Sequence, residues 1–435
     1  MRFLGIGKDG SLGDMYLNLS EAGHEVKAYI GTPQWQGILA GLIQRTDDWK
    51  QELDWIREGD GIIIFEAADC GELQDALRKD GFSVIGGSAI GDRMESDRDF
   101  GQSCMRQAGM TTAATQNFTD FGQAIDFIQS RPRRYVLKLS GLGHASSANV
   151  VGEMEDGSDI AALLRRHRTG WPADTPPNFI LMDHVSGVEV GVGGYFNGEQ
   201  FLDAVVIDWE HKKFFPGDMG ELTGEMGTLL SYRNGGPLFD ATLSKMAPQL
   251  RSYGYVGYIN INTIVNQDGI WPLEFTCRFG YPGAAICSCL HEEGWDILFQ
   301  RMIRKDSLHF PTSPGFAAGV VLTVPPFPEC DDYSEVSKGL PILFREPPNA
   351  EDRSHFHLSE VELRDGGLVT TGGTGSLMAV TGTGITADEA CAAAYRRCRN
   401  IVVPNLRYRT DIGARFLARD RALMRQWGLW PSTGP

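Results

Sequence analysis

The chain has 435 residues, of which 42% are hydrophobic and 22% charged, a composition that is ordinary for a globular protein of two to four packed lobes. Its formal net charge of −16 argues against nucleic acid or an anionic membrane as the main partner, although one basic pocket can still bind an anionic substrate. No run of eighteen apolar residues occurs and the first residues contain no apolar secretory segment, so we expect a cytoplasmic protein. We also expect small-molecule substrates, and a monomer or homodimer.

Short apolar strands alternate with amphipathic helices at the start of the chain. The expected strands are 2–7, 24–31, 60–67 and 82–88, and the expected helices are 13–23 and 71–81. This alternation predicts a doubly wound parallel sheet over roughly the first ninety residues.

The middle of the chain changes to a helical pair followed by β structure. Residues 96–110 and 120–131 read as helices, and 134–151 as a strand, a Gly/Ser loop and a second strand, which together form a flap. Residues 178–214 predict a meander of strands, and 253–280 a hairpin with an Asp-Gly turn.

A third pattern begins near Phe316. Residues 317–328 and 366–384 predict strands with glycine turns. Thr386 stands three residues before Glu389, a capping box that predicts a helix beginning there.

The eight cysteines contain no CxxC pair. The closest two, Cys287 and Cys289, are two residues apart in an apolar segment that we expect to be a strand. We therefore expect reduced thiols, with neither a disulfide framework nor a cysteine metal site.

A glycine motif follows the first strand. Gly5, Gly7 and Gly10 fit the dinucleotide fingerprint, but the second strand ends without the acidic residue that binds ribose. The pattern favours a glycine turn that closes a βα unit, with a ligand phosphate at the helix N-terminus as the open alternative.

Two later segments are typical of nucleotide binding, and each alone is weak. Lys138 ends a strand beside a loop of small residues, where backbone N–H groups can approach phosphate oxygens; the alternative is a solvated lysine at a strand end. Met182 and Asp183 lie in an apolar segment followed by Glu189, a combination that can line an adenine and bind ribose hydroxyls.

Glu274 is the single carboxylate of an apolar strand and needs a positive partner. The partner is Arg278, a bound metal ion, or both. A simple Glu274–Arg278 ion pair is the purely structural alternative.

In this order the segments resemble the ATP-grasp superfamily, and more closely the glycinamide ribonucleotide synthetase (phosphoribosylamine–glycine ligase) family. The similar segments are "VLKLSGLGHASSANVV", "MDHVSGVEVG", "WEHKK", "LTGEMG", "LEFTCRFGYPG" and "YRTDIGARF", which span nearly the whole chain. The resemblance implies an ATP-grasp fold of mixed α/β and α+β type. Its expected parts are an N-terminal α/β domain (1–100), an ATP-grasp domain (101–315) with a lid at about 115–185, and a β-rich C-terminal domain (316–435).

The resemblance also implies roles for individual residues. It assigns ATP to Arg98, Lys138, Gly141, Ser146, Ser147, Met182, Asp183, Val185, Glu189 and Lys212. It assigns substrate binding to Glu225, Arg278 and Gly280, and a metal ion to Glu274, Thr276 and Asn262. Glu274 and Arg278 are the catalytic pair, and the cofactors are ATP and Mg²⁺, with Mn²⁺ as an alternative.

The sequence departs from the family at several of these positions. Thr276 replaces a metal-binding Asn, Arg98 replaces a lysine, and the flap lysine is absent, with His144, Ser146 and Ser147 near its place. Glu225 is an added charge on the substrate side, where it either holds a substrate ammonium or is a surface turn charge.

The resemblance predicts an ADP-forming carboxylate–amine ligase. We expect ATP to phosphorylate glycine or another amino acid, and an amine, first of all phosphoribosylamine, to attack the acyl phosphate, giving glycinamide ribonucleotide for purine biosynthesis. The altered substrate side leaves two alternatives: a divergent ligase for a different amine or nucleotide derivative, and a nucleotide-binding protein that has lost turnover.

Overall fold

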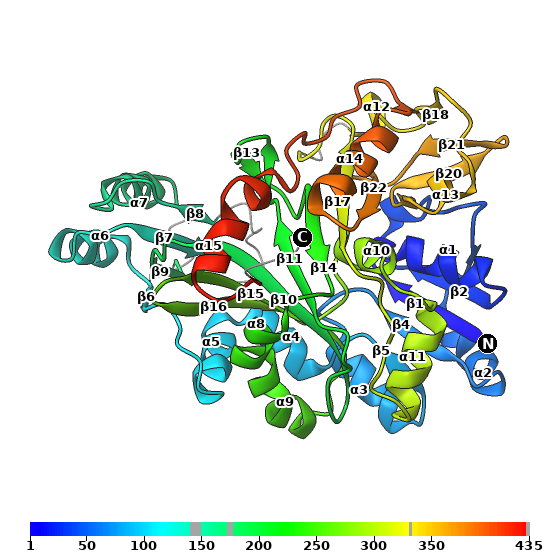
Figure 1. Cartoon of the computed structure of the whole chain (residues 1–435), viewed down its shortest axis with the longest axis horizontal. Helices are drawn as coiled ribbons and strands as arrows, with labels where there is room; N and C mark the ends of the chain where they lie inside the picture. The colour runs from blue at the N-terminus through cyan, green and yellow to red at the C-terminus, as the bar shows by residue number, and fades with distance from the viewer. Residues whose placement is uncertain (140–148, 172–176, 330–332, 432–435) are drawn as a thin grey trace.

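The computed structural model describes residues 1–139, 149–171, 177–329 and 333–431. Its N-terminal part is a five-stranded parallel sheet in the order β3-β2-β1-β4-β5, at the blue end of Figure 1. The strands are β1 (Arg2–Gly7), β2 (Glu25–Ile30), β3 (Gln44–Arg45), β4 (Ile62–Phe65) and β5 (Ser83–Ile85). The helices are α1 (Gly13–Glu21), α2 (Leu53–Glu58), α3 (Gly71–Lys79) and α4 (Ala89–Ser96). The predicted parallel sheet is confirmed, and every residue of β4 is buried, as expected for an inner parallel strand.

A buried carboxylate lies against the glycine turn between β1 and α1. Glu66 follows β4 and is 2% exposed. A Cβ atom at Gly7 would overlap the Glu66 carboxylate, so this position requires glycine. Burial, helped by the charge of Asp9, raises the pKa of Glu66 to about 8.

We expect Glu66→Gln to flatten the dependence of stability on pH. Because the folded-state pKa of Glu66 lies above the usual 4.5, folding is favoured by its protonation below pH 4.5, and this contribution is lost as the pH rises towards 8. The full shift corresponds to roughly 5 kcal/mol of unfolding free energy, which the neutral amide would keep at high pH. Urea unfolding at several pH values measures it. Glu72→Gln, at an exposed position of α3, is the control. If the unfolding free energy depended on pH equally in the wild type and in Glu66→Gln, the prediction would be contradicted.

A smaller four-stranded sheet follows, in the order β6-β9-β7-β8. Its strands are β6 (Thr115–Phe118), β7 (Tyr135–Leu139), β8 (Val150–Val151) and β9 (Phe179–Asp183), preceded by α5 (Arg98–Gln107) and packed with α6 (Phe121–Ser130) and α7 (Ser158–Gly170). Phe118, Phe121 and Phe179 belong to a hydrophobic core of its own, and Figure 1 shows α6 and α7 together at the left edge of the molecule. β7 and β8 pair antiparallel, which confirms the two strands of the flap. Gly141, His144, Ser146 and Ser147, in the loop between them, lie outside the described residues.

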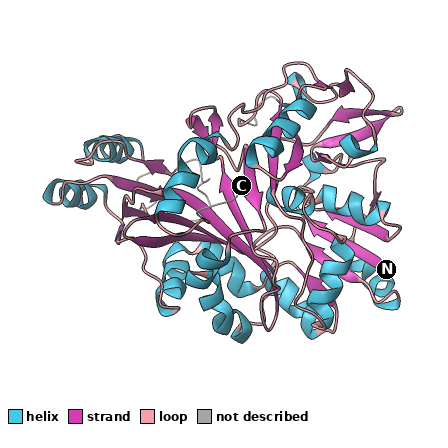
Figure 2. Ribbon diagram, in the orientation of Figure 1, coloured by secondary structure: helices cyan, strands magenta, loops and turns pink. Residues whose placement is uncertain are grey.

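The largest sheet has eight antiparallel strands in the order β16-β15-β10-β11-β14-β17-β22-β19 and crosses the centre of Figure 2. They are β10 (Val188–Asn197), β11 (Val206–Glu210), β14 (Gly227–Ser231), β15 (Val256–Asn266), β16 (Gly269–Thr276), β17 (Phe316–Thr323), β19 (Phe356–Leu358) and β22 (Ser376–Gly384). The predicted hairpin of β15 and β16 is confirmed, and Asn266 caps its turn by accepting hydrogen bonds from the Asp268 and Gly269 N–H groups. β17 pairs with β14, so the sheet continues through the predicted domain boundary at 316.

The remaining elements surround this sheet. The helices are α8 (Gly236–Ala241), α9 (Leu243–Ser252), α10 (Gly283–Ser288), α11 (Trp295–Arg304), α12 (Tyr333–Val336), α13 (Ala350–Arg353), α14 (Ala387–Cys398) and α15 (Arg421–Gln426). The short strands are β12 (Lys213–Phe215), β13 (Met219–Leu222), β18 (Leu343–Phe344), β20 (Val361–Arg364), β21 (Gly367–Thr370) and β23 (Ile401–Val402). The capping box of Thr386 and Glu389 is present. Among the described helices, none has the length and apolar character needed to cross a bilayer.

The expectation that Cys287 and Cys289 lie on a strand is wrong. Cys287 lies in α10, and Cys289 is the residue that caps its C-terminus. The seven cysteines of the described segments are free thiols, while Cys330 falls outside those segments.

Candidate active site

Polar residues of four neighbouring strands share one face of the eight-stranded sheet. Glu274 is opposite Asn262, Asn262 is opposite Gly191, and Gly191 is opposite Asp208. Residues directly opposite in a sheet project to the same side, so these positions form a row across β16, β15, β10 and β11. Val190, Val192 and Ile261 alternate with them and are buried on the other face. Apolar and polar residues alternate along these strands, so one face of the sheet packs in the core and the other carries the polar residues of the candidate site.

Three basic side chains surround the carboxylate of Glu274. Arg98 donates from Nη1 to Oε2 at 2.7 Å, Lys138 Nζ lies 3.5 Å from the same oxygen, and Lys212 Nζ lies 3.8 Å from Oε1. Lys138, followed by Lys212 and Arg98, outweighs burial and holds the pKa of Glu274 well below its usual range. The alternative of a Glu274–Arg278 ion pair is wrong, because these three cations are the partners of the carboxylate.

Lys212 joins Glu274 to two further carboxylates. Its Nζ lies 3.1 Å from Glu210 and 3.5 Å from Glu189, and Asn262 donates from Nδ2 to Glu189 at 2.9 Å. Burial alone would lower the pKa of Lys212, but Glu210, Glu189 and Glu274 outweigh it and raise the pKa well above its usual value. We call Arg98, Lys138, Glu189, Lys212, Asn262 and Glu274 the charged cluster.

The charged cluster bridges the four-stranded and the eight-stranded sheets. Lys138 comes from β7 of the four-stranded sheet, whereas Glu274 comes from β16 of the eight-stranded sheet. Burial, the first cause, lowers the pKa of Lys138 even though Glu274 opposes the shift. Two sheets that face each other across buried lysines form the type of cleft that can hold a polyphosphate.

Three predicted nucleotide residues lie where the chain passes from the small sheet to the large one. Met182 is 5% exposed in β9, and Val185 lies in the short connection between β9 and β10. The carboxylate of Asp183 accepts from Arg133 Nη1 at 2.6 Å. The connection places the backbone of these residues near the junction of the sheets, and their contact with adenine stays a prediction.

The residues predicted to bind a metal ion form an all-oxygen donor set. Glu274 and Asn262 are register partners, and Thr276 lies two residues beyond Glu274 on β16. A carboxylate, an amide oxygen and a hydroxyl are hard donors, and Mg²⁺ bound to nucleotide usually needs only one or two protein ligands. These residues fit Mg²⁺, with the basic side chains of the charged cluster available for phosphate oxygens.

Arg278 is held by a different carboxylate. Its Nε donates to Glu95 Oε1 at 3.0 Å, and the second oxygen of Glu95 accepts from the Cys277 N–H at 2.7 Å. Glu95 belongs to α4, so the N-terminal part of the chain orients the turn after β16. The guanidinium side chain is 37% exposed, and a guanidinium group can make a bidentate contact with a carboxylate.

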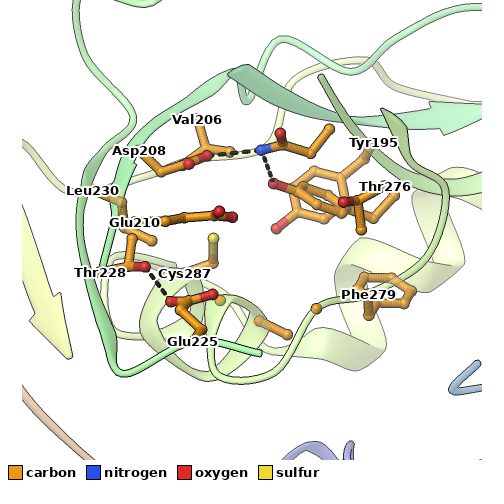
Figure 3. Close-up of a pocket in the computed structure, with 15 residues that line it drawn as sticks. Tyr195, Val206, Asp208, Glu210, Glu225, Thr228, Leu230, Thr276, Phe279 and Cys287 are labelled. Atoms are coloured by element: carbon orange, nitrogen blue, oxygen red, sulfur yellow. Dashed lines mark hydrogen bonds between the residues drawn. The ribbon is translucent and has the colours of Figure 1, made fainter. Parts of the chain in front are cut away.

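A pocket with three carboxylates adjoins the charged cluster (Figure 3). Asp208 and Glu210 come from β11 and Glu225 from the segment before β14, and Figure 3 shows all three on one side of the pocket. Tyr195, Thr276 and Phe279 lie on the opposite side. The complete lining is Tyr195, Val206, Asp208, Glu210, Glu225, Thr228, Leu230, Tyr258, Asn260, Thr276, Phe279, Gly280, Gly283, Ala284 and Cys287. We call this the acidic pocket.

Two carboxylates of the acidic pocket, Asp208 and Glu225, form no ion pair with the described residues, whereas Glu210 pairs with Lys212 at 3.1 Å. Asn260 donates to Asp208 at 2.7 Å and the Thr228 hydroxyl donates to Glu225. Burial, followed by the charge of Glu210, raises the pKa of Asp208 and of Glu225. An incoming cation would stabilise the ionised forms, so the pocket is suited to an ammonium group.

Sequence reasoning found Glu225 but missed Asp208 and Glu210. Their spacing, two apart on a strand, was a signal that both face the same side. Gly191 was a second signal, because a Cβ atom there would collide with the Asp208 carboxylate. The placement of Glu225 in a pocket disfavours its reading as a surface turn charge.

Comparison with family models gives two matches in chain order. Residues 96–284 match the model described as phosphoribosylglycinamide synthetase, ATP-grasp (A) domain, and residues 317–415 match the C domain of the same synthetase. The chain is 26% identical over 365 residues to the phosphoribosylamine–glycine ligase of Ralstonia nicotianae, which covers 81% of this chain and 83% of that protein. It is 25% identical over 385 residues to the enzyme of the same name from Listeria monocytogenes, covering 86% and 87%.

Solved structures give the same fold. The crystal structure of phosphoribosylamine–glycine ligase from Thermotoga maritima matches with a TM-score of 0.73 and 21% identity, covering 95% of this chain and 100% of that one. The biotin carboxylase–β-γ-ATP complex from Campylobacter jejuni matches with a TM-score of 0.64 and 10% identity, covering 98% of both. At these identities the likeness establishes fold alone, and the predicted fold class is confirmed.

Proposed function

We propose that this chain, which belongs to the phosphoribosylglycinamide synthetase family of ATP-grasp proteins, is an ADP-forming ligase that joins glycine to phosphoribosylamine. The relatives of that name, which each cover more than four-fifths of the chain, support the assignment. The observation that carries it is the charged cluster, because three basic side chains that could bind phosphate and a carboxylate that could bind a metal ion meet there between two sheets. The product would enter purine biosynthesis.

The charged cluster supports the nucleotide half of the reaction. Lys138, Lys212 and Arg98 would release Glu274 and bind the phosphates of ATP, since a polyphosphate offers them more negative charge. Glu274, Asn262 and Thr276 would hold Mg²⁺, which supplies charge neutralisation as the γ-phosphoryl group moves. Met182, Asp183 and Val185 would line the adenine, and Glu189 would bind the ribose.

Gly141, Ser146 and Ser147 are proposed as phosphate contacts from the flap. Small residues allow their backbone N–H groups to approach phosphate oxygens. Closure of the flap would exclude water from the acyl phosphate, which otherwise hydrolyses.

Arg278 and the acidic pocket support binding of an amino acid. Arg278 would hold the carboxylate of the substrate. One oxygen of that carboxylate would then attack the γ-phosphorus of ATP, and ADP would leave. Glu225, with Asp208, would hold the ammonium group, and Gly280 also lines the pocket. An amine then attacks the acyl carbon, phosphate departs, and an amide bond has formed.

The acidic pocket also favours a second candidate, a ligase for another amine or a larger amino acid. Its three carboxylates and aromatic wall offer more negative and apolar surface than the ammonium of glycine needs. The reaction type is unchanged in this alternative. Only the substrate differs.

Product analysis separates these candidates. Purified protein is incubated with ATP, Mg²⁺, glycine and freshly generated phosphoribosylamine, and ADP and product mass are followed; single omissions of each substrate are the controls. Formation of ADP and glycinamide ribonucleotide together supports the first candidate. ADP formed only with other amino acids or amines supports the second. ATP binding with no ADP from any pair would overturn both in favour of a nucleotide-binding protein without turnover.

We expect Glu225→Gln to raise the KM for the amino acid by about tenfold to a hundredfold, with a smaller effect on kcat, because the amide cannot neutralise an ammonium group. Steady-state kinetics with each substrate varied in turn measure the effect. Glu221→Gln, an exposed glutamate four residues earlier, is the matched control. A raised KM for ATP with an unchanged KM for the amino acid would contradict this role.

A further inference from the structure

A cluster of metal-binding side chains lies at the other edge of the eight-stranded sheet. Cys289 follows α10, while His355 and His357 lie at the start of edge strand β19. Their donor atoms all fall within 4.8 Å of one another. β16, which carries Glu274, is the opposite edge strand, so this cluster is separate from the charged cluster.

The distances between these donors suit a single tetrahedral ion. Cys289 Sγ lies 3.4 Å from His357 Nε2 and 3.9 Å from His355 Nδ1. Zinc–sulfur bonds of about 2.3 Å and zinc–nitrogen bonds of about 2.0 Å at tetrahedral angles place sulfur and nitrogen about 3.5 Å apart. The observed separations bracket this value, so small side-chain movements would complete the site.

A fourth donor, the hydroxyl oxygen of Thr381, faces the same point. The Thr381 hydroxyl lies 2.7 Å from His355 Nδ1, 2.9 Å from His357 Nε2 and 3.1 Å from Cys289 Sγ. This hydroxyl, or a water molecule that replaces it, would occupy the fourth position. Without a metal ion, the same contacts form a network of hydrogen bonds, which is the competing account of the cluster.

Asp14 supplies the supporting contact that metal-bound histidines usually have. Its carboxylate lies 2.9 Å from His357 Nδ1, the ring nitrogen away from Cys289. A carboxylate on the outer nitrogen fixes the ring and directs the lone pair of the inner nitrogen towards a metal ion.

The two histidines of the cluster are buried, and Cys289 is partly buried. His355 is 9% exposed and His357 is 3% exposed. The three donors therefore lie inside the protein and not among exposed surface groups.

We infer that Cys289, His355 and His357 bind one divalent ion of the zinc class, with Asp14 as the orienting carboxylate. Cys289 follows α10, and the two histidines lie at and just before β19, while Asp14 belongs to α1. The ion would therefore join the end of α10 to the C-terminal strands and, through Asp14, to the N-terminal part of the chain. Mixed sulfur and nitrogen donors favour zinc over Mg²⁺, which takes oxygen. The site is structural and does not depend on the proposed ligase activity.

The test is the metal content of the full-length protein. Protein purified under reducing conditions is loaded with Zn²⁺ and passed through a desalting column. Its zinc content per chain is then measured by inductively coupled plasma mass spectrometry. We expect about one zinc per chain, and less than about a tenth of that for Cys289→Ser and for His357→Ala, because each removes one of three protein ligands. Cys398→Ser, a buried cysteine of α14, and His309→Gln, an exposed histidine, are the matched controls and should keep zinc.

A second measurement does not depend on how the variants fold. Co²⁺ added to the wild-type protein should give thiolate-to-cobalt charge-transfer absorption, which Zn²⁺ removes by displacement, and chelation of zinc should lower the Tm. Folded wild-type protein with less than about a tenth of a zinc per chain after loading would overturn the site in favour of the hydrogen-bonded network. Full zinc retention by folded Cys289→Ser would also overturn it.

Discussion

Glu274→Gln should lower kcat by about a thousandfold or more while leaving the protein folded. The substitution removes the charge that would hold Mg²⁺ at the transferring phosphoryl group, and loss of one such electrostatic contact commonly costs this much. The fold should survive because Lys212 still contacts the carboxylates of Glu189 and Glu210. ADP release measures the first effect, and thermal unfolding the second.

Binding of nucleotide without metal gives a sharper readout of the same variant. In the wild type, Arg98, Lys138 and Lys212 contact Glu274, so under the proposed function this carboxylate would compete with the phosphates of ATP for them. Glu274→Gln should therefore bind metal-free ATP at least as tightly as the wild type, although it has lost turnover. Glu199→Gln, which removes a surface partner of Lys305, is the control. Near-normal turnover in Glu274→Gln would remove Glu274 from the metal site.

Arg278→Lys should lower kcat/KM by about a hundredfold even though the charge is kept. Arg278 uses Nε for Glu95 and leaves two terminal nitrogens for a planar, bidentate contact with the substrate. A lysine has a single ammonium group, which Glu95 would capture. Kinetics with the amino acid varied should show most of the loss.

Arg251→Lys is the matched control, since Arg251 donates to the Glu199 carbonyl on the surface. We expect it to keep wild-type kcat/KM. Equal activity of Arg278→Lys and the wild type would show that the fork geometry of the guanidinium is not used.

Local pattern was enough to predict much of the fold. The apolar run at 62–65 and the capping box at Thr386 depend on neighbours within a few residues, and both gave the expected element. The segment around Cys287 did not, because a short apolar run fits either a strand or a helix. Packing of α10 against β14, β17 and β22 settles it as a helix, and this contact is invisible in the sequence.

The sequence pointed to residues that the fold brings together, but it did not predict the contacts that they make. Family motifs pointed to Glu274, Lys138 and Lys212, which the fold brings together from distant segments. The partner of Arg278 could not be predicted from sequence spacing. Glu95 lies in a helix more than 180 residues earlier, and local sequence patterns do not show which distant segments pack together. Asp208 required knowledge of strand register for the same reason.

The pairing of β14 with β17 decides how the chain can be divided. β14 reads Gly-Thr-Leu-Leu-Ser and is wholly buried, and β17 covers the edge that it would otherwise expose. A fragment ending at residue 315 would leave an uncovered apolar strand with free N–H and C=O groups, which invites association with other chains. The residues after 315 therefore complete the sheet that carries the active site. A protein cut or recombined at that junction would be expected to aggregate instead of folding.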